Sequence, residues 1–571
     1  MKKIYSLLLA GLTCMSISSC SDSDYDEKYK NPANTETVGI PQVFTGVMYK
    51  GNVWMNLKYY NYYVHSSTAG LFAGVVGDNN NRGRYLGATE SYFNTEWVEF
   101  YDMVTQLRLL EQNYDKLPDE QKPMNEIFVH LARTMVYSRL HEMVAMWGDV
   151  PYNGAGYLWS TSDYEGAKTA CVYDDDVELY KQILTGLKEA ADYLNGNIDP
   201  AVLTTLARQD YSVAKGDINI WRKYINSLRL RVALHLSSNG DCVADAHAAI
   251  KEILENPGKY PVIENNSENM GVMCDTQSDD FNFAKDYSNA LHTGYMGNVS
   301  ATLLKAMNVP ANGIPDVNTD PRIQVMCDPN PDGEYVSFDI TKTNAEITRL
   351  EDEKRKEYIE RKIMNANYYC KVDSQAIMGR TGGQGNENLF SMWIGAAEVS
   401  LSKAEAYLMG YGVAVDQAAA KANFVNGVTQ SVEYYWEQKE NSTLYKEGND
   451  SYNGYRALVR PSEDEIAAYI ENIWEPTQEA ICTQLWLNFG FLNEHAAWNV
   501  VRRTGYPVVE FSRDAQVSSY PTPPHRLPYT SDELNFNSTN CQNAIKLNYS
   551  ESTGYYTKLF WAKDNYYSLI D

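Results

Sequence analysis

The sequence predicts an all-α protein in which helices pack as antiparallel pairs. Nine segments carry apolar residues three and four positions apart, the spacing that lines one face of an α-helix. Hydrophobic residues make up 44% of the 571-residue chain, enough to bury a large core. Beyond the N-terminus, no stretch approaches the ~20 uninterrupted apolar residues of a membrane span. The helical segments are 98–117, 124–147, 175–195, 218–238, 242–256, 396–411, 415–437, 462–473 and 478–503.

The first residues have the pattern of a bacterial lipoprotein signal peptide. Two lysines precede an apolar stretch, 4–17, which is too short for a permanent membrane span, and Cys20 follows two serines. We expect residues 1–19 to be removed and Cys20 to carry lipid, because two or three acyl chains anchor a protein stably. Residues 20–32 begin with an acidic run and form a flexible tether. The alternative is an ordinary secretory signal in which Cys20 is incidental.

The net charge limits the partners of the mature protein. The formal charge is −25, and removal of the signal's two lysines changes it to −27. Such a surface repels phosphate backbones and anionic lipid headgroups. We therefore expect no nucleic-acid partner, and contact with a membrane through the lipid anchor only.

Residues 33–571 are expected to form a single helical domain with long loops. The segment 177–194 has small residues where a neighbouring helix must approach, as in half of a tetratricopeptide hairpin. No strict 34-residue period recurs, so the scaffold is a degenerate one. Two irregular regions, at about 79–95 and 264–388, are rich in Asn, Gly, Asp and Pro. Long loops on a rigid scaffold are where binding residues concentrate.

Six separate segments carry recognisable local signatures. In the same order, they closely resemble the SusD/RagB family of outer-membrane lipoproteins, and the loop lengths are most similar to its second SusD-like subgroup. The resemblance runs from about residue 33 to the C-terminus. The segments are MWGDVPYNGAGY (146–157), DINIWRKYINSLRLRVALHLS (217–237), DPR (320–322), AAEVSLSKAEAYLMG (396–410), WNVVRRTGYPVV (498–509) and PHRLPYTSDELNFN (524–537).

This resemblance implies both a fold and a function. Members have four tetratricopeptide-like hairpins that support loop-rich binding elements. They are surface-exposed lipoproteins of the outer membrane and sit as lids over a SusC-like, TonB-dependent transporter. They capture nutrients, most often oligosaccharides, for import. The same resemblance leaves a second function open, since some relatives take up peptides.

The matched motifs are predicted to be scaffold. In the helix at 218–238, apolar residues occupy two faces, so Asn226, Arg229 and Arg231 must find buried polar partners. Gly505 and Pro507 mark the end of a helix, because glycine supplies the C-terminal turn and proline prevents continuation. Trp221 is expected to be a core residue.

No catalytic signature accompanies these motifs. The chain has 74 acidic residues, so a carboxylate pair at glycosidase separation could arise by chance, and sequence spacing cannot locate one. We therefore expect a binding protein that is not an enzyme and has no cofactor, with a surface glycoside hydrolase as a weaker alternative. The start of a calcium loop is mimicked by Asp328, Asn330 and Asp332, but the flanking prolines and Asp339, in place of a bidentate Glu, favour a turn.

Glycan binding needs aromatic faces for sugar rings and planar donors and acceptors for hydroxyl groups. Three clusters offer both, and a solvated loop or a transporter-facing surface is the alternative for each. The first comprises Asp78, Asn80, Arg82, Arg84, Tyr85 and Tyr92; the second Phe281, Phe283, Tyr287 and Tyr295; the third Arg380 and Trp393.

Overall fold

Helices form most of the structure, a computed structural model that confirms the all-α prediction. It describes residues 38–53, 57, 66–77, 90–161, 163–293, 297–364, 366–379, 382–445, 458–512, 522–552 and 554–570. Cys20 and the tether therefore lie outside the described residues. The longer helices are α3 (Ile40–Val53), α5 (Glu90–Asp115), α6 (Glu126–Trp147), α9 (Asp176–Leu194), α10 (Pro200–Gln209), α11 (Ile218–His235), α12 (Val243–Glu255), α13 (Phe283–Thr293), α16 (Asn344–Glu360), α17 (Ala396–Met409), α18 (Gln417–Glu440), α19 (Glu463–Ile473), α20 (Gln478–Phe489), α21 (Glu494–Thr504) and α23 (Ser538–Asn548).

Shorter helices and strands connect these elements. Within the described part of the chain, no helix combines the length and the apolarity that crossing a bilayer requires. The short helices are η1 (Ser66–Gly70), η2 (Asp119–Met124), α7 (Leu158–Thr161), α8 (Tyr164–Ala170), η3 (Asn266–Glu268), α14 (Ala301–Ala306), α15 (Ile323–Met326) and α22 (Ser531–Phe536). The strands are β1 (Val76–Gly77), β2 (Met270–Met273), β3 (Asn298–Val299), β4 (Cys327–Asp328), β5 (Lys371–Val372), β6 (Phe390–Ile394), β7 (Val509–Ser512) and β8 (Tyr567–Ile570).

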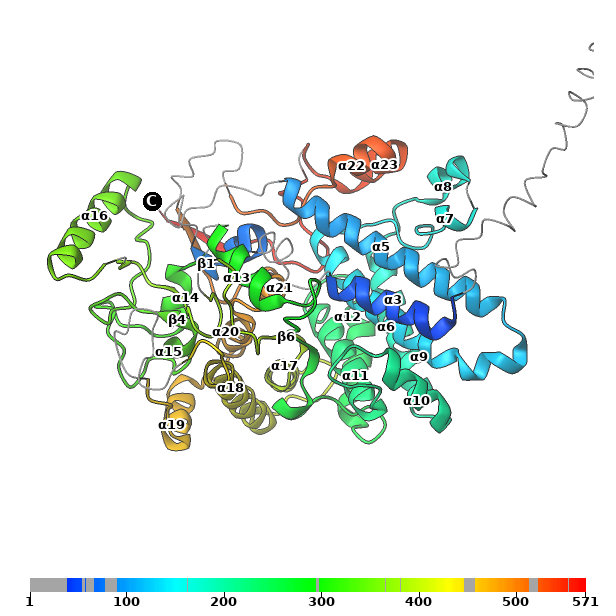
Figure 1. The fold of residues 1–571 in the computed structure, drawn as a ribbon, viewed down its shortest axis with the longest axis horizontal. Helices are drawn as coiled ribbons and strands as arrows, with labels where there is room; N and C mark the ends of the chain where they lie inside the picture. Colours follow the sequence, from blue (N-terminus) through cyan, green and yellow to red (C-terminus); the bar gives the residue numbers. More distant parts are fainter. Residues whose placement is uncertain are drawn as a thin grey trace, which may run out of the picture.

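The long helices pack as a row of neighbouring pairs. Helix α3 packs on α5 and α6, α9 on α6 and α11, α11 on α12, and α17 on α18 and α20. Figure 1 shows this row along the long axis, from α3, α5 and α6 at one end through α11 and α17 to α18, with α16 at the opposite end. Close approach depends on small residues: a Cβ at Gly186 would lie 2.2 Å from the Tyr137 ring of α6. The predicted tetratricopeptide-like pairing is thus present.

The observed helices differ from the sequence prediction in several places. The segment predicted as one helix at 478–503 is two, α20 and α21, because Gly490 adopts a left-handed φ of 43° between them. Helix α5 begins at Glu90, so the end of the irregular region at 79–95 is helical. Helix α16 lies inside the irregular region at 264–388. It buries only Ile347 and Tyr358, so the sequence has too few apolar residues at helical spacing to predict it.

The strands form small sheets that connect scaffold and loops. The largest has the order β1-β3-β5-β4, and β7 pairs in parallel with β8. Strand β2 pairs antiparallel with β6, placing Met273 opposite Phe390. Strand β6 leads into α17, whereas β2 leads into the loop before α13. This pair therefore fixes that loop to the helical scaffold.

Asn226, Arg229 and Arg231 of α11 each have a backbone-carbonyl or carboxylate partner, as the sequence predicted. Arg231 forms two hydrogen bonds with the Glu398 carboxylate of α17, at 2.5 and 2.6 Å. Arg229 pairs with Glu252 of α12. The Asn226 side-chain amide donates to the Pro261 carbonyl oxygen at 3.1 Å. Trp221 is fully buried. These conspicuous motif residues hold helices together.

Candidate ligand-binding site

Two cavities lie on either side of one loop, residues 274–284, which we call the strap. The polar cavity has a volume of about 530 Å³ and the aromatic cavity about 260 Å³. Residues of the strap line both. The polar cavity is lined by Thr276, Gln277, Asn282, Ala284, Gly383, Gln384, Gly385, Glu387, Thr443 and Leu444. The aromatic cavity is lined by Tyr211, Ser212, Val213, Lys215, Val272, Met273, Cys274, Asp275 and Phe281.

The strap is shaped by hydrogen bonds among its own residues. The Asp275 backbone N–H donates to the Phe281 carbonyl oxygen at 2.9 Å and closes the loop. The Asp275 carboxylate accepts the Gln277 N–H at 2.9 Å, and the Ser278 hydroxyl accepts the Asp280 N–H at 3.2 Å. Asp and Ser favour turns because their side chains can bond the backbone two residues on. The loop therefore has a defined shape without regular secondary structure.

Two other segments complete the polar cavity. The first, residues 383–387, passes so close to the strap that a Cβ at Gly385 would lie 2.0 Å from the Ala284 carbonyl oxygen. The second follows α18, and its Thr443 hydroxyl accepts the Glu387 backbone N–H at 3.1 Å. Segments that are remote in sequence thus meet at one surface, above α13 and β6.

The polar cavity presents groups suited to sugar hydroxyls. Amide side chains come from Gln277, Asn282 and Gln384, and hydroxyl groups from Thr276 and Thr443. Amides can donate and accept in one plane, and hydroxyls can rotate to either role. These neutral donors and acceptors, together with the Glu387 carboxylate, can bind a polyol.

The aromatic cavity presents exposed ring surface. Tyr211 is 43% exposed, and its ring centroid lies 5.6 Å from that of Phe281. Tyr49 of α3 lies against Phe281 in an edge-to-face arrangement, with ring centroids 6.1 Å apart. The Tyr49 hydroxyl donates to the Asp280 carboxylate at 2.6 Å, and this bond raises the pKa of Tyr49 to about 12. Tyr49 therefore anchors the strap to the scaffold.

The structure separates the predicted glycan-binding residues into three groups. Of the predicted residues that the structure describes, Phe281 alone lines one of the two cavities. Phe283, Tyr287 and Trp393 are buried in the core, so their prediction as ligand contacts is corrected. Tyr92 belongs to helix α5, so its prediction as a loop residue is corrected too. Asp78, Asn80, Arg82, Arg84, Tyr85, Tyr295 and Arg380 lie outside the described residues.

Tertiary contacts explain the corrections. The Tyr287 hydroxyl donates to the Phe491 carbonyl oxygen at 2.7 Å, which satisfies it within the core. The Trp393 ring packs beside Tyr224 of α11, with centroids 5.5 Å apart. In the sequence, Tyr287 and Trp393 lie near polar loop residues, and this position led to their prediction as ligand contacts. Conversely, sequence reasoning missed Tyr211 and Gln384, and for Gln384 the only signal was the glycine-rich segment that contains it.

Comparison with known proteins identifies the family to which this chain belongs. The family model described as "SusD-like_2: Starch-binding associating with outer membrane" matches residues 34–530. The chain belongs to this SusD-like family. No curated protein matches the chain.

Solved structures share the SusD-like fold at low identity. One described as a chitin-binding protein has 20% identity and a TM-score of 0.67, covering 91% of this chain and 99% of its own. A chitin-binding SusD homolog from Flavobacterium johnsoniae has 16% identity and a TM-score of 0.62, with coverages of 91% and 98%. A SusD homolog from Bacteroides fragilis has 17% identity and a TM-score of 0.64, with coverages of 92% and 99%. These likenesses establish the helical fold.

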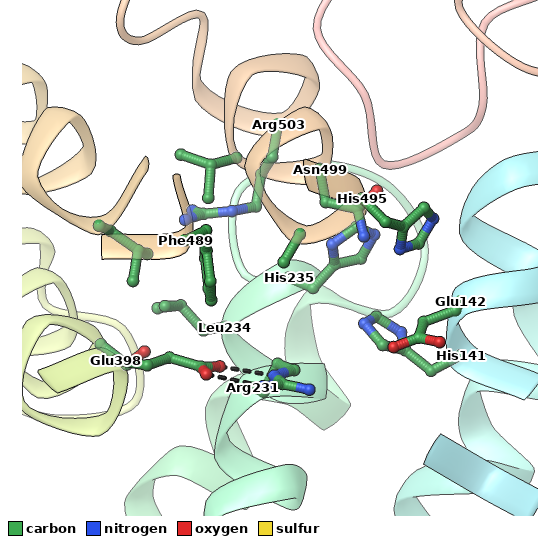
Figure 2. A pocket seen from close by; sticks show the side chains of 14 residues that line it. His141, Glu142, Arg231, Leu234, His235, Glu398, Phe489, His495, Asn499 and Arg503 are labelled. Atoms are coloured by element: carbon green, nitrogen blue, oxygen red, sulfur yellow. Dashed lines mark hydrogen bonds and ion pairs between the residues drawn. The ribbon is translucent and has the colours of Figure 1, made fainter. Parts of the chain in front are cut away.

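A third cavity lies inside the SusD-like scaffold, between α6, α11, α17, α20 and α21. Figure 2 shows the Arg231–Glu398 pair on one side of it and His141, His235 and His495 beyond. Its volume is about 40 Å³, room for water and not for a sugar. Burial lowers the pKa of His141 to about 3. This internal cluster belongs to the scaffold.

The residues of the calcium-loop alternative are engaged by different partners. Asp332 accepts hydrogen bonds from Arg361 at 2.6 Å and from the Tyr358 hydroxyl at 3.2 Å. The Asn330 side chain accepts the Asp332 and Glu334 backbone N–H groups. Asp328 is partly buried, and its loss of solvation raises its pKa to about 7. The arrangement favours the turn.

One acidic group among the described residues has oxygens close enough to hold a cation. The carboxylates of Asp149, Asp175 and Asp176 lie within 4.8 Å of one another. Asp149 already accepts the Asp176 backbone N–H at 2.9 Å and the Asn548 amide at 2.6 Å. Burial raises the pKa of Asp176 to about 7. The group stands at the N-terminus of α9, where carboxylates complement the helix dipole.

Proposed function

We propose that this SusD-like protein is a cell-surface lipoprotein that binds glycans at the strap and delivers them to a TonB-dependent, SusC-like transporter. The observation that carries the proposal is the pairing of the two cavities. One offers amides and hydroxyls, and the other offers the exposed ring of Tyr211 and the half-buried ring of Phe281. Sugars need both, because their hydroxyl edges hydrogen-bond while their C–H faces stack on aromatic rings.

The family description and the similar structures support a carbohydrate as the ligand class. The former names starch binding, and two similar structures are described as chitin-binding. Open sites exchange hydrogen bonds to water for bonds to protein, with a small net gain of about 0.5–1.5 kcal/mol each. We therefore expect micromolar to millimolar dissociation constants. Weak capture suits a protein that must release its cargo into a transporter. The protein acts by binding, without catalysis.

Calorimetry with starch- and chitin-derived oligosaccharides tests the proposal. Affinity should rise from the monosaccharide to a tetrasaccharide, because each added ring gains contacts while the entropy of association is lost only once. A complex isolated from the native membrane should contain a transporter barrel and bind more tightly than the lipoprotein alone. Absence of a barrel from that complex would refute the transporter role. Oligosaccharide cleavage during the titration would refute a purely binding function.

A further inference from the structure

We infer that the strap site selects neutral or amine-bearing glycans and disfavours glycans that carry carboxylate or sulfate groups. This inference rests on the proposed function and adds the charge class of its ligand. It comes from the excess of acidic over basic side chains along the strap and the first turn of α13, among the residues that the structure describes.

One acidic residue lines each cavity, and acidic residues outnumber cationic ones along the strap. Glu387 lines the polar cavity and Asp275 the aromatic cavity. Lys215 is the only cationic residue among the described lining residues of either cavity. The strap and the first turn of α13 contain four aspartates and one lysine. These are Asp275, Asp279, Asp280, Asp286 and Lys285.

The lining carboxylates form no ion pair with a described residue. Asp275 and Glu387 are both exposed, and neither forms an ion pair with any residue in the described part of the chain. Asp275 is oriented by the Gln277 N–H, and the Glu387 backbone by the Thr443 hydroxyl. An anionic ligand would meet Glu387 in the polar cavity and Asp275 in the aromatic cavity. The nearby described cations are Lys285, which packs beside Gly383, and Lys215, and the acidic residues of the strap and the cavities outnumber them.

Electrostatics sets the expected size of this selectivity. Like charges a few ångströms apart repel at a protein surface, and salt screens the effect over a Debye length of about 8 Å at physiological ionic strength. Neutral glycans are unaffected by this repulsion. We expect roughly tenfold weaker binding of an anionic form than of its neutral counterpart at low salt, and a smaller difference at high salt. A cationic form should bind at least as well as the neutral form.

Matched polysaccharides separate charge from backbone shape. Affinity electrophoresis of the purified mature lipoprotein would use starch, carboxymethyl starch and aminoethyl starch, and a chitin series of glycol chitin, carboxymethyl chitin and glycol chitosan. Asp275→Asn and Glu387→Gln should each raise affinity for the carboxymethyl forms several-fold. Glu120→Gln, which changes the net charge equally at an exposed position on η2, should not.

The outcomes distinguish this inference from the proposed function. Binding of neutral and cationic forms with weak, salt-dependent binding of carboxymethyl forms supports both. Equal binding of neutral and carboxymethyl forms overturns the charge selectivity and leaves glycan binding intact. The same holds if the two site variants behave like Glu120→Gln. If no member of either series binds, both proposals fall.

Discussion

Arg503 of α21 and Glu405 of α17 form a buried ion pair with two hydrogen bonds, at 2.5 and 2.7 Å, near the middle of the scaffold. The Arg503 and Glu405 side chains are 3% and 0% exposed. Burial alone would raise the pKa of Glu405, but Arg503 lowers it below its ordinary value. The pair joins the C-terminal helices to the central hairpin, so the WNVVRRTGYPVV motif contributes to structure.

Removal of one partner should strongly destabilise the protein. Glu405→Gln leaves the Arg503 charge buried without its counterion, and such changes cost about 3–5 kcal/mol. Urea denaturation at pH 7 would measure the loss. The matched control is Glu471→Gln, which removes an exposed partner of Lys421 and should cost no more than about 1 kcal/mol. Similar losses for both variants would contradict the scaffold role of the buried pair.

Buried histidines should make the protein sensitive to acid. Burial lowers the pKa of His141 to about 3, against an ordinary value of about 6.5. Below pH 6.5 the unfolded chain therefore binds a proton at this site that the folded protein does not, so folding stability falls as pH drops. Arg231 also faces this ring and opposes its charging.

The variant His141→Asn isolates that contribution. Its stability relative to wild type should rise as pH falls from about 6.5 towards 4, because the other titrating groups are common to both proteins. Thermal denaturation at several pH values would measure this. A stability difference that does not change with pH would show that His141 is protonated in the folded state.

Much of the scaffold is readable from the sequence because its signals are local. Apolar spacing places α9 and α11 within a few residues of their true ends, and Gly505 ends α21 in the left-handed conformation that glycine favours. The sequence also predicted that Asn226 and the neighbouring arginines form polar contacts within the protein. A helix that is apolar on two faces is buried on both, so these side chains cannot reach water.

The ligand site is less predictable because distant segments build it. Phe281 and Phe283 are two residues apart in a polar stretch, yet one lines a cavity and the other is fully buried. The difference depends on where α13 begins and on Tyr211, which is 70 positions away in sequence. Such contacts have no local signature, whereas aromatic residues beside amides suggest binding wherever they occur.

The proposed lipid anchor at Cys20 gives a prediction about location. Cys20→Ala should release the protein from the membrane fraction, because an acidic N-terminal segment has no affinity of its own for anionic lipid. Labelling of intact cells, with fractionation, would compare the variant with wild type. Ser18→Ala keeps the cysteine and a small residue before it, and it should remain anchored. Surface labelling of an anchored Cys20→Ala protein would show that another segment holds it.

The neighbouring phenylalanines give a test that separates binding from folding. Phe283→Ala removes a fully buried ring and should cost about 3–5 kcal/mol of stability. Phe281→Ala removes a half-buried ring at the aromatic cavity and should cost clearly less, while weakening oligosaccharide binding by roughly two- to tenfold through lost stacking of about 0.5–1.5 kcal/mol. Denaturation and calorimetry on both variants would measure the two effects. If Phe281→Ala binds oligosaccharide as tightly as wild type, the aromatic cavity is not part of the glycan site.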